Sequence, residues 1–352
     1  MSREPVRVGV VGAGWWTTKT HLPVLTTHPD AEVVALCDLD AERASAAAEA
    51  FGVPEVFSDV HQLTELVDAA VVATPQGAHH QPAAVLLDAG IDTLVEKPLT
   101  VDPAEAWDLV ARAESSGARL HVGNTFPYQP AVQRAREILT SGRLGGRVLA
   151  TGLFSTAVSH LYYGNTEPAR TNTGALAAPM PATYADPDSG GHLYTQLSHA
   201  VAVLLFILDE PVVRVCALEH RGGAEVDIAD GLTMTTASGM VLTLAGAGTV
   251  PANDQRVEEY RFFGESGTLL LDTVASTVEL RHGSREGSGA CEQERFAATD
   301  IAVSPPQQLI ASAQGAEVIA PGRLGARVVE VLAAARQSAR TNGQPIEIKE
   351  HA

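Results

Sequence analysis

Residues 8–17 read Val-Gly-Val-Val-Gly-Ala-Gly-Trp-Trp-Thr and place a glycine pair directly after an apolar run. A strand that ends in such a turn can bring backbone N–H groups against a pyrophosphate at the start of the next helix. Gly12 and Gly14 suit this turn, while Thr17 replaces the third glycine of the usual Gly-x-Gly-x-x-Gly pattern. The stretch therefore predicts a dinucleotide site, with a simple strand-to-helix turn as the alternative.

The first 123 residues alternate β-branched runs with alanine-rich helical stretches, which is typical of stacked β-α-β units. Strands are expected at 6–11, 33–37, 70–73, 93–95 and 120–122. A helix is expected over 40–51, between Asp40 as its N-cap and Gly52 as its C-cap, and another over 102–116. The pattern predicts a Rossmann domain over residues 1–123, with a doubly wound parallel sheet.

The pattern changes beyond residue 124, after a helix expected over 130–141. Strand-like segments then dominate, at 148–154, 212–219, 232–236, 241–245, 259–263, 268–271 and 277–280. Such a run predicts a large, mostly antiparallel open sheet with one face free for helices or a partner subunit. Residues 155–189 are expected to form a long lid or binding loop. We predict a second domain of the α+β class over residues 124–352, for substrate binding and oligomerisation.

The chain of 352 residues is long for a single core, which supports two domains. Hydrophobic residues make up 45% and charged residues 19%, values typical of a globular protein with packed interiors. The net charge of -18 would repel nucleic acids and anionic membranes over most of the surface. We therefore expect no nucleic-acid or membrane partner, and a small neutral molecule as substrate.

Three cysteines, Cys37, Cys216 and Cys291, lie far apart and lack the close spacing of zinc ligands. They favour a reducing cytoplasm, and no metal site is expected. The N-terminal residues run into the first strand without an apolar signal region, and no later stretch reaches the about 18 apolar residues of a membrane span. Secretion and membrane spanning are therefore not expected.

An acid at the end of the second expected strand supports the dinucleotide site. Asp38 follows Gly14 at the spacing expected for the carboxylate that accepts hydrogen bonds from the adenosine ribose hydroxyls. Asp40 already fills the helix-capping role that is the alternative for Asp38. An acid repels a 2′-phosphate and Leu39 adds no positive charge, so NAD is favoured over NADP. Arg43 is the reason to keep NADP as the alternative.

The ends of the next two strands add polar groups, because carboxyl ends of parallel strands face the ligand crevice. Thr74 and Pro75 follow one strand, and His79 opens the next helix, as a cofactor contact or a solvated helix-start histidine. Glu96 and Lys97 end the following strand. Lys97 could hydrogen-bond a substrate hydroxyl and stabilise a developing alkoxide. The alternative for this pair is a surface ion pair.

The triplet Glu96-Lys97-Pro98, the glycine turn and a downstream histidine motif resemble the glucose-fructose oxidoreductase, inositol dehydrogenase and MocA (Gfo/Idh/MocA) family. Residues 121–124, 262–269 and 333–346 extend the likeness over nearly the whole chain. The resemblance implies an NAD-dependent oxidoreductase that transfers hydride between nicotinamide and a secondary alcohol or ketone. The implied substrate is a sugar, a sugar derivative or a cyclitol.

The resemblance also implies the catalytic residues, Lys97 and His199. His199 ends the segment Ser-Gly-Gly-His-Leu-Tyr-Thr-Gln-Leu-Ser-His of residues 189–199, and a histidine near neutral pKa suits proton exchange with an alcohol. Many members carry Asp four residues before and three residues after this histidine, where this chain has Thr195 and Ala202. His199 thus lacks an obvious acidic partner, which leaves more of the proton transfer to Lys97. A core histidine is the alternative for His199.

The remaining expected contacts follow from these motifs. The cofactor contacts are Gly12, Ala13, Gly14, Trp15, Trp16, Asp38, Thr74, Pro75, His79, Glu96, Lys97 and Asn124. The substrate contacts are Tyr128, His192, Tyr194, Thr195 and Gln196. Weaker candidates for lining a sugar site are His160, Tyr162, Tyr163 and Tyr184.

Two other functions stay open at this point. Relatives that this chain resembles include glycosidases that use NAD for transient oxidation, and the loss of the acid at Thr195 is compatible with them. A dinucleotide-binding sensor without catalysis is the other alternative, against which Glu96-Lys97-Pro98 argues. The resemblance further implies a homodimer or homotetramer formed through the open face of the second sheet.

Overall fold

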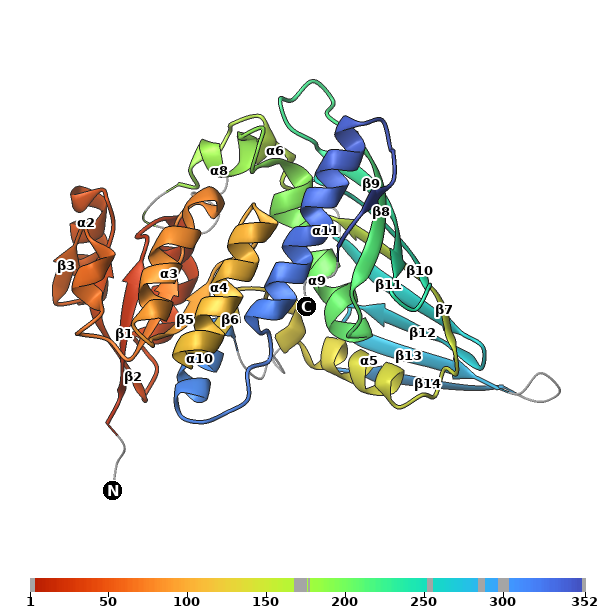
Figure 1. Cartoon of the computed structure of the whole chain (residues 1–352), viewed down its shortest axis with the longest axis horizontal. Coiled ribbons are helices and arrows are strands. Elements are labelled where there is room, and N and C mark those ends of the chain that lie inside the picture. Colours follow the sequence, from red (N-terminus) through yellow and green to blue (C-terminus); the bar gives the residue numbers. More distant parts are fainter. Residues whose placement is uncertain are drawn as a thin grey trace. The chain divides into compact units, whose positions relative to one another are not determined.

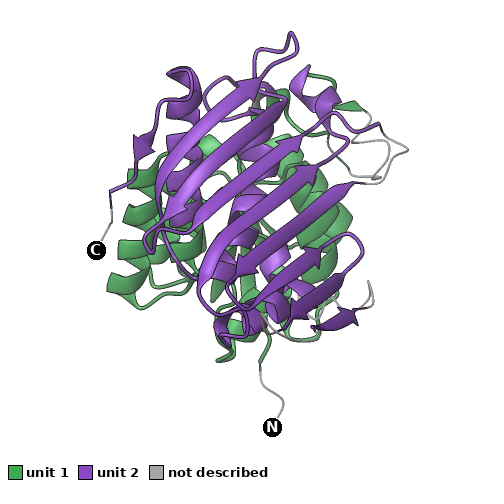
Figure 2. Cartoon of the chain, turned by 90° about the vertical axis from the view of Figure 1, so that its right-hand side faces the viewer, with its two compact units in different colours: residues 1–124, 164–184, 303–326 green, residues 125–163, 185–302, 327–352 purple. Residues whose placement is uncertain are grey.

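The computed structural model describes residues 4–167, 176, 178–251, 256–283, 289–296 and 304–349. The chain forms two compact units (Figure 2). Unit 1 comprises residues 1–124, 164–184 and 303–326, and unit 2 comprises residues 125–163, 185–302 and 327–352. One segment from the middle of the chain and one near its C-terminal end therefore belong to the same unit as the N-terminal residues.

Unit 1 is built on a six-stranded sheet with the order β3-β2-β1-β4-β5-β6, in which every pairing is parallel. The strands are β1 (Val6–Val11), β2 (Ala31–Cys37), β3 (Glu55–Phe57), β4 (Ala69–Val72), β5 (Asp92–Val95) and β6 (Leu120–Val122). All residues of β4, β5 and β6 are buried, as expected of parallel strands covered on both faces. The predicted doubly wound sheet is confirmed.

The second long segment between strands, helix α2 (Ala41–Phe51), begins and ends at the residues that local signals predict. Asp40 accepts a hydrogen bond from the Arg43 N–H at 3.0 Å, and Gly52 closes the helix in the left-handed region at φ 70°. The helical segments are η1 (Thr17–His21), α1 (Leu22–Leu25), α2 (Ala41–Phe51), η2 (Val60–Leu63), η3 (Gln76–Ala78), α3 (His80–Asp88), α4 (Pro103–Ser116), α8 (Pro181–Ala185) and α10 (Pro305–Ala313).

Helix α10 supplies part of the core of unit 1 although it lies far along the chain from the strands it covers (Figure 1). Its Leu309 and Ile310 are buried in one cluster with Val10 and Val71. Ser312 on the same helix lies 2.8 Å from Nε2 of His121 on β6. No local pattern in the sequence predicts that α10 packs in the core of unit 1.

Unit 2 contains a nine-stranded sheet with the order β14-β13-β12-β11-β7-β10-β9-β8-β15. Its strands are β7 (Arg147–Ser155), β8 (Val212–His220), β9 (Ala229–Thr236), β10 (Val241–Ala247), β11 (Val257–Gly264), β12 (Gly267–Asp272), β13 (Thr277–His282), β14 (Ala290–Arg295) and β15 (Ile346–Glu347). Only the pairing of β7 with β10 is parallel among these strands. The predicted mostly antiparallel sheet is confirmed.

Two helices pack together on one side of this sheet. They are α5 (Pro130–Thr140), which contacts β12 and β13, and α9 (Ser198–Leu208), which contacts β7 and α5. Every residue of α9 except His199 is buried. Figure 2 shows the opposite face of the sheet turned to the viewer. The helix α11 (Gly322–Arg340) follows near the C-terminus.

Parts of the chain depart from the expected pattern. The expected loop 155–189 contains the short helices α6 (Ser159–Tyr162) and α8, while its residues 168–175 and 177 lie outside the described residues. The strand β14 was not predicted, because its sequence Ala-Cys-Glu-Gln-Glu-Arg lies at an exposed sheet edge and lacks apolar alternation. Within the described ranges no helix is both long and apolar enough to cross a membrane.

Candidate active site

The glycine turn after β1 has room for backbone only. Gly12 adopts φ +96°, and a Cβ added there would lie 2.6 Å from the carbonyl oxygen of Ala73. Its N–H donates to Cys37 O at 2.8 Å, which ties the turn to the end of β2. Only glycine fits this position. The turn leads into η1 and forms the bare backbone cradle that a dinucleotide pyrophosphate requires.

Two threonines hydrogen-bond the backbone of the turn, one of them at the position of the missing third glycine. Thr17 Oγ1 donates to Gly12 O at 2.6 Å, and Thr18 Oγ1 donates to Gly14 O at 3.2 Å. These hydroxyls supply hydrogen-bond donors to carbonyl groups of the turn, at the point where the π-helix η1 begins.

Asp38 lies beside the turn at the end of β2. Its Oδ2 accepts from Ala13 N at 2.7 Å and its Oδ1 accepts from Asp40 N at 2.9 Å. The Arg43 guanidinium adds two further hydrogen bonds, from Nη2 to Oδ1 at 2.6 Å and from Nε to Oδ2 at 3.2 Å. Burial opposes ionisation, but the hydrogen bonds from Arg43, Asp40 and Ala13 outweigh it and lower the pKa of Asp38.

Glu96 clamps the start of η1 to the end of β5. Its Oε1 accepts from Trp16 Nε1 at 2.9 Å and from His21 Nε2 at 3.0 Å, and its Oε2 accepts from the Lys97 N–H at 3.0 Å. Gly123 makes room for this carboxylate, because a Cβ there would lie 2.7 Å from Oε1. Burial opposes ionisation, yet His21 and Lys97 together lower the pKa of Glu96. Glu96 thus holds Trp16 beside the glycine turn.

Lys97 follows Glu96 and precedes Pro98 across a cis peptide bond. Burial lowers the pKa of its amine to about 8, although the charge of Glu96 opposes this shift. A lysine with this pKa can gain and lose a proton near neutral pH. Tyr184 on α8 shares this environment, since burial and the charge of Glu96 raise the pKa of its hydroxyl.

The other expected cofactor contacts of unit 1 include His79, which is bonded to backbone carbonyl groups, and Asn124, whose side-chain oxygen has no partner among the described residues. His79 is 1% exposed, with Nδ1 3.0 Å from Pro98 O and Nε2 2.9 Å from Thr74 O, a geometry that favours a structural role. Thr74 is half-buried and Pro75 is exposed. Asn124 is buried at the end of the β6 segment, and its Oδ1 has no hydrogen-bond partner among the described residues. This oxygen is available to accept a hydrogen bond from a bound ligand.

In unit 2, residues 189–199, which end in His199, contain the π-helical segment η5 (Leu193–Leu197). The chain continues from η5 directly into α9. Gln196 and His199 lie one turn apart and are both partly exposed. The His199 ring packs against Phe126 and Phe154, at centroid distances of 5.4 and 6.2 Å. Thr156 Oγ1 donates to the Gln196 amide oxygen at 3.3 Å. These contacts fix both side chains on the accessible side of the segment.

The other expected substrate contacts are buried. Thr195 Oγ1 donates to Gly191 O at 2.6 Å and lies 3.1 Å from the Tyr162 hydroxyl. The Arg336 guanidinium covers the Tyr194 ring at 4.9 Å from its centroid. Tyr128 is buried as well. The contacts of Thr195 and Tyr194 favour a role in holding η5 in place rather than direct substrate contact.

A buried charged cluster that no sequence motif revealed supports the start of this segment. His192 is fully buried, and its Nδ1 lies 2.8 Å from Asp230 Oδ2. Asp227 accepts from the Leu193 N–H at 2.6 Å and from Arg336 Nη2 at 3.0 Å. Burial raises the pKa of Asp227 and of Asp230 to about 7 and lowers that of His192 to about 4. Asp227 thus satisfies a backbone donor at the start of the helix that carries His199.

Carboxylate oxygens of Glu219, Asp227 and Asp230 lie within 4.8 Å of one another in this cluster. Two guanidinium groups partner them, since Arg336 contacts Asp227 and Arg221 Nη2 lies 2.7 Å from Glu219 Oε1. Arg336 is one of several charged residues in α11, so nothing in the sequence distinguishes it as the buried member of this cluster.

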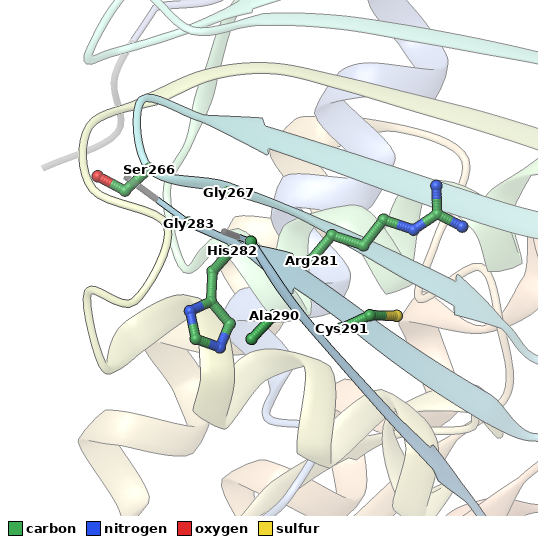
Figure 3. A pocket seen from close by; sticks show the side chains of 8 residues that line it. Ser266, Gly267, Arg281, His282, Gly283, Ala290 and Cys291 are labelled. Carbon is green, nitrogen blue, oxygen red and sulfur yellow. The ribbon is translucent and has the colours of Figure 1, made fainter. Parts of the chain in front are cut away.

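A shallow hollow in unit 2 is separate from these residues (Figure 3). It lies where β12 begins, β13 ends and β14 begins, and it is lined by Ser266, Gly267, Arg281, His282, Gly283, Gly289, Ala290 and Cys291. His282 shares Glu292 with Arg143 in an exposed ion-pair group. The hollow contains none of the expected site residues and is not the candidate site.

Comparison with known proteins identifies the family. Residues 6–124 match the oxidoreductase family with an NAD-binding Rossmann fold, and residues 132–270 match the GFO/IDH/MocA C-terminal domain. The chain belongs to the Gfo/Idh/MocA family. The predicted family and the predicted NAD-binding Rossmann domain are confirmed.

Relatives within the family act on sugars and cyclitols by name. D-apiose dehydrogenase of Paraburkholderia graminis is 31% identical over 164 residues, 45% of this chain and 44% of that protein. The chain thus spans less than half of the first curated relatives it matches. Inositol 2-dehydrogenase 1 of Saccharopolyspora erythraea is 28% identical over 98% of this chain and 96% of that one.

A solved structure shows the same fold. The WlbA dehydrogenase of Bordetella pertussis, in complex with NADH and UDP-GlcNAcA, superposes with a TM-score of 0.75 at 23% identity. The match covers 99% of this chain and 100% of that one. At this identity the likeness concerns the fold alone.

Two glycine substitutions in the family's turn are expected to separate folding from cofactor binding. Gly12→Ala should lower the free energy of unfolding by about 2–4 kcal/mol, because its Cβ would collide with Ala73 O at positive φ. Gly14→Ala has no atom within 4 Å of its Cβ and should fold normally. It should still bind NADH at least about tenfold more weakly, because the methyl group keeps the pyrophosphate from the backbone.

Urea denaturation and titration of NADH fluorescence measure the two effects. Unchanged NADH affinity in a folded Gly14→Ala protein would show that the turn does not hold the cofactor.

Proposed function

We propose that this chain is an NAD-dependent dehydrogenase or reductase that acts on a secondary alcohol, or its ketone, of a sugar, sugar derivative or cyclitol. The observation that carries the proposal is Lys97, a lysine with a lowered pKa at the carboxyl end of β5 in an NAD-binding unit. The names of the curated relatives, among them an apiose and an inositol dehydrogenase, support the substrate class.

Lys97 exchanges the proton in this mechanism. Bound NAD supplies the hydride acceptor, and NADH the donor in the reverse direction. When the alcohol is oxidised to the ketone with NAD as the hydride acceptor, the neutral Lys97 amine would take the proton from its hydroxyl. Glu96 accepts a hydrogen bond from the backbone N–H of Lys97 and so fixes the backbone from which the lysine side chain extends. His199 is the second candidate for proton exchange, and Gln196 orients the substrate.

The chain's own groups fit the dinucleotide. The residues proposed to hold it are Gly12, Ala13 and Gly14 at the pyrophosphate, Asp38 at the ribose hydroxyls, and Asn124 through its unsatisfied oxygen. Trp15 and Trp16 directly follow the turn, and their rings lie at a centroid distance of 5.4 Å.

The first experiment is an assay of NADH formation with a panel of sugars, inositols and amino sugars. Turnover with one of them supports the dehydrogenase. Cleavage of an aryl glycoside without net NADH would overturn it in favour of a glycosidase, and cofactor binding without either reaction would indicate a sensor. The curated relatives are named as dehydrogenases and reductases, which favours the first outcome.

The oxidation rate is expected to rise with pH until Lys97 has lost its proton. Because the folded pKa of Lys97 is about 8, kcat/KM for oxidation should increase up to about that pH and then level off. Reduction, which needs the protonated amine, should decline over the same range. Residual activity of Lys97→Arg should lack this inflection, since arginine stays charged; the same inflection in that variant would assign the proton transfer to another group.

The assembly and location are proposed on other grounds. The open face of the unit 2 sheet carries exposed apolar side chains such as Leu153, Leu218 and Val241, which suit a homodimer or homotetramer. Three cysteines without disulfide bonds suit a reducing cytoplasm. Light scattering of the purified protein tests the assembly.

A further inference from the structure

The Asp38 carboxylate already accepts four hydrogen bonds within the protein, and a carboxylate offers only about four lone-pair positions. Two of the donors are the backbone N–H groups of Ala13 and Asp40, which the turn and the start of α2 hold in place. The other two belong to the Arg43 side chain. A ribose that donates its hydroxyls to Asp38 must therefore displace Arg43.

Arg43 is suited to leave Asp38. It lies in the first turn of α2, its side chain is 33% exposed, and its Nη1 also contacts Asp40 Oδ2 at 3.1 Å, so a partner remains when Asp38 is given up. Leu39, which follows Asp38, is 93% exposed and adds no charge beside the carboxylate, whose own side chain is 8% exposed. The guanidinium keeps its positive charge at every relevant pH.

We propose that Arg43 sets the cofactor preference, by competing with the ribose of NAD for Asp38 and by binding the 2′-phosphate of NADP, so that the chain accepts both dinucleotides. With NAD, the two ribose hydroxyls replace the two Arg43 donors on Asp38. With NADP, Arg43 turns from Asp38 to the phosphate, which it can bind through two parallel hydrogen bonds. Asp38 then keeps its two backbone donors, which moderate its repulsion of the phosphate.

The competition has an unusual consequence. Removal of Arg43 should weaken NADPH binding and should not weaken NADH binding, because it frees two acceptor positions on Asp38. A residue that only stabilised α2, or that only stacked on the adenine, would affect both cofactors alike.

The test is the dissociation constant of NADH and of NADPH, measured by nicotinamide fluorescence in the parent, Arg43→Ala and Asp38→Asn. The inference rests on the proposed assignment of Asp38 to the cofactor ribose. In Arg43→Ala, NADPH should bind about 10- to 100-fold more weakly, the effect of one lost charge-assisted contact, with NADH binding unchanged or tighter. Asp38→Asn should show the opposite, weaker NADH and tighter NADPH. The matched control is Arg112→Ala, which removes another half-exposed, doubly ion-paired arginine of unit 1 and should change neither constant.

Other outcomes overturn the proposal. They are equal weakening of both cofactors in Arg43→Ala, or NADPH binding by the parent more than about a hundredfold weaker than NADH binding. Salt provides a second readout, since NADPH affinity should fall with ionic strength more steeply in the parent than in Arg43→Ala. Binding does not depend on turnover of any polyol, so a failure of the proposed reaction leaves this test intact. A failure of the cofactor site itself would appear separately, as NADH binding that Gly14→Ala does not weaken.

Discussion

Replacement of Lys97 by methionine is expected to lower kcat for polyol oxidation by about a thousandfold, the effect of losing a positioned acid-base group. Methionine keeps the unbranched stem but has no proton to exchange and no charge to stabilise an alkoxide. NADH affinity should stay close to that of the parent, because the backbone N–H of residue 97 can still donate to Glu96. Initial rates and NADH fluorescence titration together separate chemistry from binding.

The chain offers a clean control for this substitution. Its only other lysines are Lys19 and Lys349. Lys349 is exposed near the C-terminus, so Lys349→Met removes the same charge from the surface and should retain full activity. Activity of Lys97→Met close to that of the parent, with the same pH dependence, would assign the proton transfer to His199 instead.

Substitution of Gly191 by alanine is expected to lower the free energy of unfolding by more than about 3 kcal/mol, through backbone strain and disruption of a buried ion pair. Gly191 has φ +82°, and a Cβ there would lie 2.1 Å from Asp227 Oδ1. Asp227 is 1% exposed and cannot move aside without giving up the Leu193 N–H or Arg336. The collision therefore acts on the whole buried cluster.

Gly223 provides the matched comparison. It has a similar φ of +88°, but no atom lies within 4 Å of the Cβ position. Gly223→Ala should therefore cost only the backbone strain, about 1–2 kcal/mol. Urea unfolding of both variants measures the difference, and an equal loss of stability in the two would show that Asp227 does not resist the added methyl group.

The features that could be predicted from the sequence are local ones. Asp40 and Gly52 mark the ends of α2 within a short window, and the glycine turn follows an apolar run directly, so each signal and its structure lie within a few residues. Lys97 at the end of β5 could be placed because a parallel strand ends in the same direction as its neighbours.

Contacts between distant segments could not be predicted in this way. Asp227 and Arg336 lie 109 positions apart and meet in one buried cluster, which no periodic pattern records. The carboxylate of Glu96, a predicted cofactor contact, accepts hydrogen bonds from Trp16 and His21, residues 80 and 75 positions away. His192, a predicted substrate contact, is buried beside Asp230, 38 positions away. In each case a partner that is distant in the sequence determines where the side chain lies and which hydrogen bonds it makes.

The return of residues 303–326 to unit 1 has a consequence for how this protein is made. Leu309 and Ile310 on α10 fill the same core as strands β1 and β4, so the nucleotide-binding unit lacks part of its interior until most of the chain has been synthesised. A nascent chain that stops at residue 124 would carry exposed apolar surface, which favours aggregation or capture by chaperones. The NAD-binding unit therefore cannot be cut out at that point and fused elsewhere as an independent module; an exchange between relatives has to carry α10 with it.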